Sequence, residues 1–323
     1  GGTQAVKYYL SGNVKDETGM YLSNDAKYRQ YQIRSNIDLQ LHKYLKLGLD
    51  LYGSSGNRER PGAHFGDIWN RIRSDMTPTL VARYPNGLLG PGFEGGNNLL
   101  AFTSNMSGYT KVKNNLIQTK ISMDLDLAGL TQGLRLMGYA SFDYNHSLTK
   151  DFIRPWTVYN YNAANDEYEP VQSAGVYGTR TLSESLNNNS SSLYNLRLMY
   201  NRTFGDHSID GFVAYEQSEG VGKFLSAFRK NLVSNDIQEL FSGESEGMTN
   251  DGGSSEWGRM HYFGSLGYNY KNKYLLDFTL RHDGSYNFAK GNRFGTFPGV
   301  SVAWRITNEE FIPDFSWLSD FKL

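Results

Sequence analysis

The 323-residue chain contains no cysteine and no long apolar run. Without cysteine it can form no disulfide and no thiolate zinc site, and it has no cysteine nucleophile. Its longest uninterrupted apolar run has four residues, for example Phe212 to Tyr215, whereas a transmembrane helix requires about 20. The first ten residues lack the charged segment and the apolar core of a secretory signal.

The chain also lacks an excess of charge of either sign. Its 32 basic and 33 acidic residues leave a net charge of −1, so it has no electrostatic footprint for nucleic acid. Glycine and tyrosine are abundant instead, with 35 and 23 residues. A mean hydropathy of −0.55 does not decide between a soluble protein and a transmembrane barrel, because barrel strands are apolar only at every second residue.

Apolar and polar side chains alternate along residues 31–41. Tyr31, Ile33 and Ile37 share one side, and Gln32, Arg34 and other polar residues share the opposite side. A period of two indicates a strand rather than a helix. The alternation resumes over residues 45–51, so the two segments predict a hairpin with a tight turn.

The same hairpin pattern recurs three times. The further hairpins are predicted at 117–144, 194–215 and 262–280, with turns at 129–133, near 205–206 and at 271–273. Flanking strands at about 3–11 and 300–304 bring the prediction to ten strands.

Short turns and long connections alternate along the chain. The predicted long connections are residues 12–28, 54–114, 146–192, 218–258 and 284–298. Short turns at one end and long loops at the other are typical of outer-membrane barrels. The predicted strands have roughly 9–13 residues, and about 9–11 cross a bilayer when tilted. The predicted fold class is therefore all-β, an antiparallel transmembrane β-barrel with long extracellular loops and short periplasmic turns.

Aromatic residues lie near both ends of the predicted strands. Tyr144 and Tyr215 lie at the long-loop end, whereas residues such as Tyr44, Tyr274 and Trp304 lie at the short-turn end. Two interfacial girdles are predicted, although aromatics also favour any half-buried sheet. In lipid we expect Ile121→Arg to cost roughly 2–4 kcal/mol and Ser122→Arg to be nearly neutral.

No motif predicts covalent chemistry. The GxGxxG at Gly90, Gly92 and Gly95 lies in a loop without the strand and helix of a dinucleotide site, so it predicts turns instead. Asp124 and Asp126 share a strand face without an acid/base partner. The six histidines have no metal-ligand spacing, and no GxSxG or SxxK occurs. The chain is therefore expected to be no enzyme and to hold no cofactor and no metal. The polar stretches 183–192 and 244–255 predict mobile loop tips.

Loop aromatics are the remaining candidates for binding, because an exposed ring can stack on a sugar or anchor a partner. The candidates for substrate binding are Trp69, Tyr84, Trp156, Tyr159, Tyr161 and Trp257. The alternative is that each ring packs its own long loop.

Residues 274–306, YLLDFTLRHDGSYNFAKGNRFGTFPGVSVAWRI, resemble a signature stretch of the SusC/RagA class of TonB-dependent outer-membrane transporters. The matching residues are Arg281, Asp283, Gly284, Ser285, Asn292, Arg293, Phe294, Gly295, Phe297, Pro298, Val300, Ser301, Trp304, Arg305 and Ile306. The segments 1–19, 27–48, 77–96 and 308–323 resemble other parts of the family, so the resemblance covers nearly the whole chain. We predict structural roles for Arg281, Asp283, Gly284, Asn292, Arg293, Gly295, Pro298, Trp304 and Arg305.

The resemblance implies import of a bulky nutrient, an oligosaccharide or a peptide, through a 22-stranded barrel with an internal plug. It implies two protein partners, a SusD-like lipoprotein at the extracellular face and the TonB complex, within the lipid of the bacterial outer membrane. Residues 1–323 are then a barrel segment in which the plug domain, the signal peptide, the TonB box and the closing strands are absent. A plugless porin or adhesin, a soluble carbohydrate-binding β protein and an outer-membrane hydrolase remain as alternatives.

Overall fold

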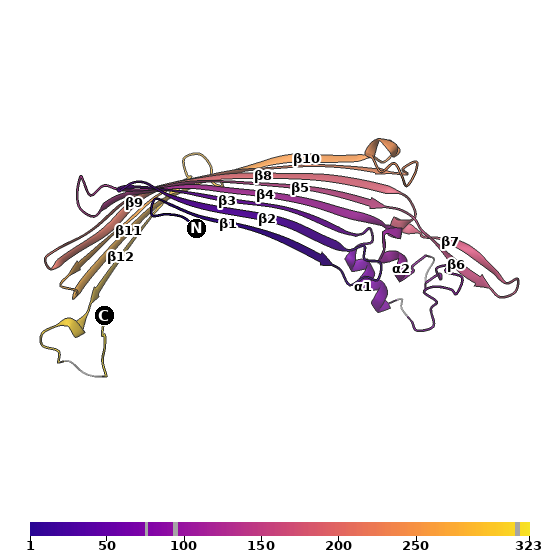
Figure 1. The fold of residues 1–323 in the computed structure, drawn as a ribbon, viewed down its shortest axis with the longest axis horizontal. Coiled ribbons are helices and arrows are strands. Elements are labelled where there is room, and N and C mark those ends of the chain that lie inside the picture. The colour runs from indigo at the N-terminus through magenta and orange to yellow at the C-terminus, as the bar shows by residue number, and fades with distance from the viewer. Residues whose placement is uncertain (75–76, 93–95, 314–316) are drawn as a thin grey trace.

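A single antiparallel sheet of ten strands dominates the computed structural model, which describes residues 1–74, 77–92, 96–313 and 317–323. Each strand pairs with the strands before and after it in the order β1-β2-β3-β4-β5-β8-β9-β10-β11-β12. The strands are β1 (Val6–Thr18), β2 (Lys27–His42), β3 (Leu45–Pro61), β4 (Gly108–Asp126), β5 (Leu134–Ile153), β8 (Thr181–Phe204), β9 (His207–Lys230), β10 (Thr249–Tyr270), β11 (Tyr274–Ser285) and β12 (Phe294–Trp304). Figure 1 shows them as a curved, open wall with β1 and β12 at its edges. The prediction of ten antiparallel strands is confirmed.

Short turns and long connections lie at opposite ends of this wall. The turns are residues 43–44, 127–133, 205–206 and 271–273, and the connections are residues 19–26, 62–107, 154–180, 231–248 and 286–293. In the turn 271–273 both Lys271 and Asn272 have positive φ, of 53° and 56°, the geometry of a type I′ hairpin turn. The four predicted turns are therefore confirmed, but the connections are shorter than predicted.

Seven of the ten strands are longer than predicted, with 16–24 residues. β1, β11 and β12 have 13, 12 and 11 residues, as predicted. Two stretches expected to be mobile loop tips lie largely in strands instead: residues 183–192 lie within β8, and residues 249–255 begin β10. Serine, asparagine and glycine are poor strand formers. Here, however, β8 is hydrogen-bonded on both sides, to β5 and β9, and this pairing outweighs the local preference. Trp257, which we expected in a loop, lies in β10, where it pairs with Gly220 of β9.

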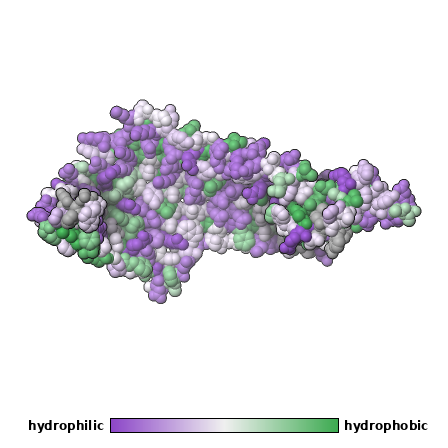
Figure 2. Space-filling model, turned by 90° about the horizontal axis from the view of Figure 1, so that it is seen from below, coloured by the Kyte–Doolittle hydropathy of each residue, from purple (hydrophilic) through white to green (hydrophobic). Residues whose placement is uncertain are grey.

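The register of the sheet separates two faces. We call one the apolar face, because paired positions along neighbouring strands carry apolar side chains, as in the row Leu45, Leu125, Leu136, Leu198, Val213, Gly264, Leu280 and Pro298. The other is the polar face, as in the row Asn36, Asp50, Lys120, Ser141, Leu193 and Ser218. Figure 2 shows hydrophilic residues spread over much of the sheet on one side of the molecule.

Aromatic rings border the apolar face at both ends. Tyr215 lies beside Tyr262, with ring centroids 5.2 Å apart, toward the long-connection end. At the short-turn end Tyr270 stacks near Tyr274 at 6.4 Å. These positions agree with the two predicted girdles.

Two long connections fold together at the end of the wall and form what we call the loop domain, residues 62–107 and 154–180. It contains α1 (Phe65–Ser74), α2 (Leu99–Phe102), η1 (Asn105–Ser107), the hairpin β6 (Thr157–Asn162) and β7 (Glu167–Gln172), and η2 (Gly175–Tyr177). Sequence patterns did not predict this hairpin. Two more short helices are η3 (Leu240–Ser242) and η4 (Ile306–Asn308). Of the helices in the described part of the chain, none is both long and apolar enough to span a membrane.

Candidate functional site

The polar face contains a hollow toward the short-turn end, with a volume of about 570 Å³. Its lining includes the basic residues Lys7, Lys46, Lys120 and Arg197 and the acidic residues Asp38 and Asp124. Asp124 is paired with Arg135 on the adjacent strand. The hollow therefore has more positive than negative charge, in a chain that is nearly neutral overall.

Aromatic rings hold cations of the polar face, and an amide holds a carboxylate there. Lys120 lies over the ring of Tyr139 at 5.2 Å, and the Arg197 guanidinium lies over Phe212 at 4.6 Å. Asn195 donates a hydrogen bond to Glu216 at 2.9 Å. Such contacts keep long side chains against the wall, so the face is polar but ordered.

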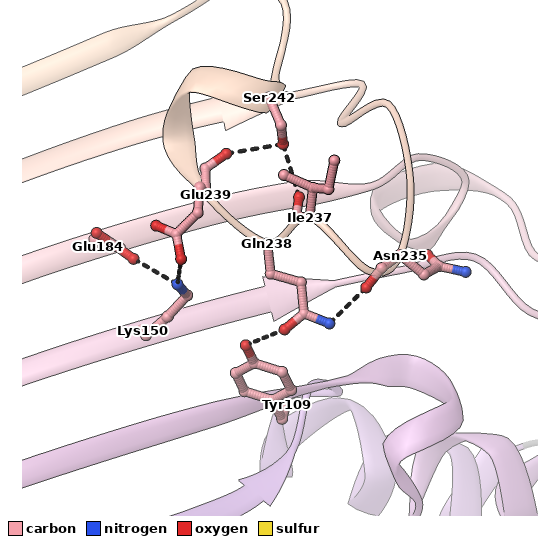
Figure 3. Close-up of polar contacts among 8 residues, drawn as sticks. All are labelled: Tyr109, Lys150, Glu184, Asn235, Ile237, Gln238, Glu239 and Ser242. Atoms are coloured by element: carbon pink, nitrogen blue, oxygen red, sulfur yellow. Dashed lines mark hydrogen bonds and ion pairs between the residues drawn. The ribbon is translucent and has the colours of Figure 1, made fainter.

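The connection 231–248 folds back over the ends of β4, β5 and β8, on the same side of the sheet as the apolar face (Figure 3). Lys150 forms ion pairs with Glu184 at 3.0 Å and Glu239 at 3.4 Å. The Tyr109 hydroxyl donates a hydrogen bond to Gln238.

A small apolar cluster lies beneath this connection. Phe152, Leu182 and Leu232 are each at most 2 % exposed. The connection is thus fixed by buried apolar contacts as well as by charge, and we call residues 231–248 the strap.

Three aromatic rings form the centre of the loop domain. Phe102, Trp156 and Tyr177 are buried with ring centroids 5.0–5.3 Å apart. The Trp156 indole N–H donates to the carbonyl of Gly96 at 2.8 Å. The Tyr177 hydroxyl donates to Asp67 at 2.5 Å, and burial together with this hydrogen bond raises the pKa of Tyr177. These contacts join the two connections. Trp156 thus packs inside the loop domain, which was our alternative to a role in substrate binding.

The other loop aromatics are less buried. Trp69 on α1 is 51 % exposed and forms a T-shaped pair with Phe65, with ring centroids 5.9 Å apart. Tyr84 packs on Tyr168 at 4.9 Å, and Tyr161, 46 % exposed, donates its hydroxyl hydrogen bond to Asp166. Tyr159 donates its backbone N–H to the Leu89 carbonyl. Trp257 is 37 % exposed and lies on the polar face, so the structure does not bring the six rings together in one site.

The signature stretch forms the β11–β12 hairpin. Arg281 pairs with Asp283 at 3.1 Å, and Asp283 also contacts His261 of β10 at 2.8 Å. Arg293 donates to the carbonyl of Phe288 at 3.2 Å. Gly284 lies against the ring of Phe294, where an added Cβ would lie 2.5 Å from a ring carbon. The remaining motif residues Asn292, Gly295 and Pro298 lie in the turn or in β12.

The chain after β12 folds back onto the last short turn. Glu309 accepts hydrogen bonds from Tyr274 at 2.7 Å, from Lys273 at 3.0 Å and from the Trp304 indole at 3.0 Å. These donors hold the pKa of Glu309 at about 2. Arg305 adds an ion pair to Asp320 at 3.2 Å.

Among the described residues, no group of three or more His, Asp or Glu side chains could hold a metal ion. In the GxGxxG stretch, Gly90 and Gly92 lie in irregular loop and Gly95 lies outside the described residues, as do positions 93–95 of the family-like loop and 314–316 near the end. Gly87 has φ of 89° and its N–H bonds the Tyr84 carbonyl, which agrees with the turn predicted there.

Comparisons with known proteins fit this geometry. No family model matches the chain. The whole chain aligns at 25 % identity with 31 % of TonB-dependent receptor P3 of Formosa agariphila. A stretch of 62 residues is 52 % identical to TonB-dependent receptor SusC of Bacteroides thetaiotaomicron, covering 19 % of this chain and 6 % of SusC. The structure of the RagAB peptide transporter matches with a TM-score of 0.73 at 19 % identity over 100 % of this chain and 35 % of that chain, which supports the fold. The chain thus spans about a third of the length of its full-length matches.

The fold defines the class of protein first. The ten strands are a wall segment of an antiparallel transmembrane β-barrel, a fold in which the apolar outer face contacts lipid and the polar inner face lines the lumen. Within this class, the chain is similar in sequence to TonB-dependent receptors that include SusC, and its fold resembles that of the RagAB transporter. The relatives named here are receptors and a transporter rather than enzymes.

Proposed function

We propose that the complete protein imports a bulky nutrient, an oligosaccharide or a peptide, across the bacterial outer membrane in a TonB-dependent manner. The observation that carries this proposal is the two-faced wall, which runs across ten strands without a break in register apart from one bulge at 40–42. A continuous lipid face with a charged, ordered lumen face suits passage of a polar solute. The similarity to TonB-dependent receptors supports TonB as the energy source for import.

The loop domain offers a surface to a protein partner at the extracellular mouth. A SusD-like lipoprotein is the partner we propose, since the chain resembles SusC and matches a RagAB complex. The exposed rings of Trp69 and Tyr161 are candidates for contacts there, and Tyr84, Tyr159 and Trp257 remain candidates for substrate contact. Trp156 and the motif residues Arg281, Asp283, Gly284, Asn292, Arg293, Gly295, Pro298, Trp304 and Arg305 are proposed to be structural.

Uptake by cells that carry the full-length gene tests this function. Fluorescent oligosaccharides and peptides are supplied as separate pools, and accumulation is measured with and without TonB. We expect one pool to accumulate only when TonB is present and the inner membrane is energised. The lipoprotein is sought by affinity purification of the full-length transporter from the same membranes.

Two outcomes contradict the proposal. Accumulation that persists without TonB favours a plugless pore, and cells that accumulate neither pool beyond a deletion strain favour an adhesin. Recovery of the transporter without any lipoprotein rejects the proposed partner while leaving import intact.

A further inference from the structure

The polar face carries two adjacent rows of side chains toward the long-connection end of the wall. The first row pairs Trp257 of β10 with Gly220, Ser191 and Asp143 of the next three strands. The second row, two residues farther from the membrane, is Ser255, Gly222, Asn189 and Asn145. Because the two rows are in register and two residues apart on every strand, all eight positions lie on the same face of the sheet.

Gly220 makes room for an indole ring to lie on the wall. A Cβ at Gly220 would lie 2.5 Å from Nε1 of Trp257, so the ring covers this position and Gly220 is buried. Any larger residue there would push the ring off the sheet. Trp257 is 37 % exposed, so it keeps area open to the lumen, and the Arg259 guanidinium lies 5.9 Å from its ring centroid.

A shallow hollow of about 230 Å³ lies beside the ring. Its lining includes Asp143, Asn145, Asn189, Ser191, Ser255 and Trp257. Asn189 Oδ1 and Ser255 Oγ flank Gly222, at 2.9 and 3.1 Å from where its Cβ would be. The amide oxygen of Asn145 is buried and accepts no hydrogen bond from the described residues. A buried polar atom without a partner is costly unless a ligand or water satisfies it.

These groups suit a sugar better than a peptide. A pyranose presents a face of C–H groups that packs on the negative face of an aromatic ring, and its hydroxyls both donate and accept, as do amides and serine hydroxyls. The backbones of β5, β8 and β9 are paired on both sides at these positions, so an extended peptide cannot pair with them. Only β10, whose residues 249–258 pair with β9 and not with β11, offers an open edge here. The volume is below that of a drug-sized pocket, which suits one unit of a longer chain.

We propose that Trp257 and the Asn145–Asn189–Ser255 group form a subsite on the lumen wall that holds one neutral sugar unit of an oligosaccharide. The ring stacks on the sugar face, and the amides and hydroxyls bind its rim. This inference rests on the proposed import function, and of the two proposed substrate classes it selects the oligosaccharide.

Purified full-length transporter, probed on an array of immobilised neutral oligosaccharides, acidic oligosaccharides and peptides, tests the subsite. We expect retention on neutral oligosaccharides. Trp257→Ala should weaken that binding about tenfold or more, as removal of a central aromatic anchor does, and Trp257→Phe should keep part of it. Gly220→Val should weaken binding similarly although Trp257 is still present, because the added side chain displaces the ring.

Phe241→Ala is the control, since Phe241 is an exposed aromatic residue on η3 outside the subsite. Folding of each variant is checked by the heat-dependent gel mobility of the barrel. Equal binding by Trp257→Ala and the native protein overturns the proposal, as does native protein that retains no neutral oligosaccharide or that prefers peptides. Neutral-sugar binding that depends on Trp257, in cells without TonB-dependent uptake, would support the subsite and reject import.

Discussion

At the scale of single residues, the side of the sheet on which a side chain lies determines the effect of adding charge. Ile121 lies on the apolar face between Leu49 and Ala140, and it is 55 % exposed in the isolated wall. We expect Ile121→Arg to destabilise the full-length transporter in lipid vesicles by roughly 2–4 kcal/mol, because the cation must enter the bilayer. Denaturant unfolding in vesicles measures the change.

The control substitution belongs at Gln118, which lies three residues before Ile121 on β4 and on the polar face. Ser122 is less suitable than the sequence suggested, because it lines the hollow that already contains Lys46 and Lys120. Gln118 is exposed and pairs in register with Asp143, so Gln118→Arg should change the free energy of unfolding little. Equal changes in the free energy of unfolding for Ile121→Arg and Gln118→Arg would show that the apolar face is not the one in contact with lipid.

A second residue, Glu309, makes the periplasmic end of the wall sensitive to acid. Its pKa is about 2 in the folded protein and 4.5 ordinarily, chiefly because Tyr274 and then Lys273 and Trp304 donate hydrogen bonds to it. A lowered pKa means that this stabilisation is complete above pH 4.5 and is lost as the pH falls toward 2. We expect the turn 271–273 and the segment 305–313 to exchange amide hydrogens faster over that interval.

Glu309→Gln should remove most of this pH dependence and raise the exchange rate at neutral pH. Glu310→Gln is the control, because the neighbouring carboxylate accepts none of these three hydrogen bonds. An unchanged acid profile in Glu309→Gln would assign the effect to another group.

At the scale of elements, the alternation of apolar and polar residues located the part of each strand that we place in the membrane. It did not show how far the strands continue beyond the membrane. Ile121 and its neighbours alternate because one side meets lipid, so a period of two is visible in the sequence. Residues 183–192 have no such contrast, since nearly every side chain on both sides of β8 is polar there. Their strand conformation depends on pairing with β5 and β9, which no local pattern encodes.

The candidate subsite was predictable only in part. Trp257 stood out as an aromatic among polar residues, although its expected place was a loop. Its partners Asn145 and Asn189 come from β5 and β8, and the register between these strands is set across the 27-residue connection 154–180. Sequence spacing does not fix that register. The rings of Phe102 and Tyr177 were missed because contacts between two separate connections create their burial.

The strap and the loop domain are predicted to open independently. Leu232→Ala should increase proteolysis and hydrogen exchange at residues 231–248, because it removes a buried side chain at a cost of about 2–5 kcal/mol. It should leave residues 62–107 protected, since Leu232 belongs to a separate apolar cluster. Phe102→Ala should have the reverse pattern. Loosening of both regions by either substitution would mean that they form one cooperative unit.

At the scale of the whole molecule, β1 and β12 are the edges of the sheet and do not pair with each other. Each therefore has one row of backbone hydrogen-bonding groups without a strand partner. Exposed edges recruit other strands, and unpaired backbone groups are not tolerated in lipid. We therefore expect residues 1–323 expressed alone to aggregate, whereas the full-length protein forms a heat-resistant barrel. Light scattering and gel mobility after refolding in detergent compare the two, and a monodisperse, detergent-free monomer of the segment would contradict the expectation.

The 24-residue strands β8 and β9 also have a consequence for the kinetics of capture. At ~3.4 Å per residue and a tilt of ~45° such strands rise roughly 55–60 Å, and the hydrocarbon core is ~30 Å thick. A collar of about 25–30 Å therefore stands above the lipid on this side. A solute that enters the collar searches a confined volume rather than an open surface, and weak contacts with its inner wall raise the effective concentration at the entrance. Capture can then be efficient even when each single contact is short-lived.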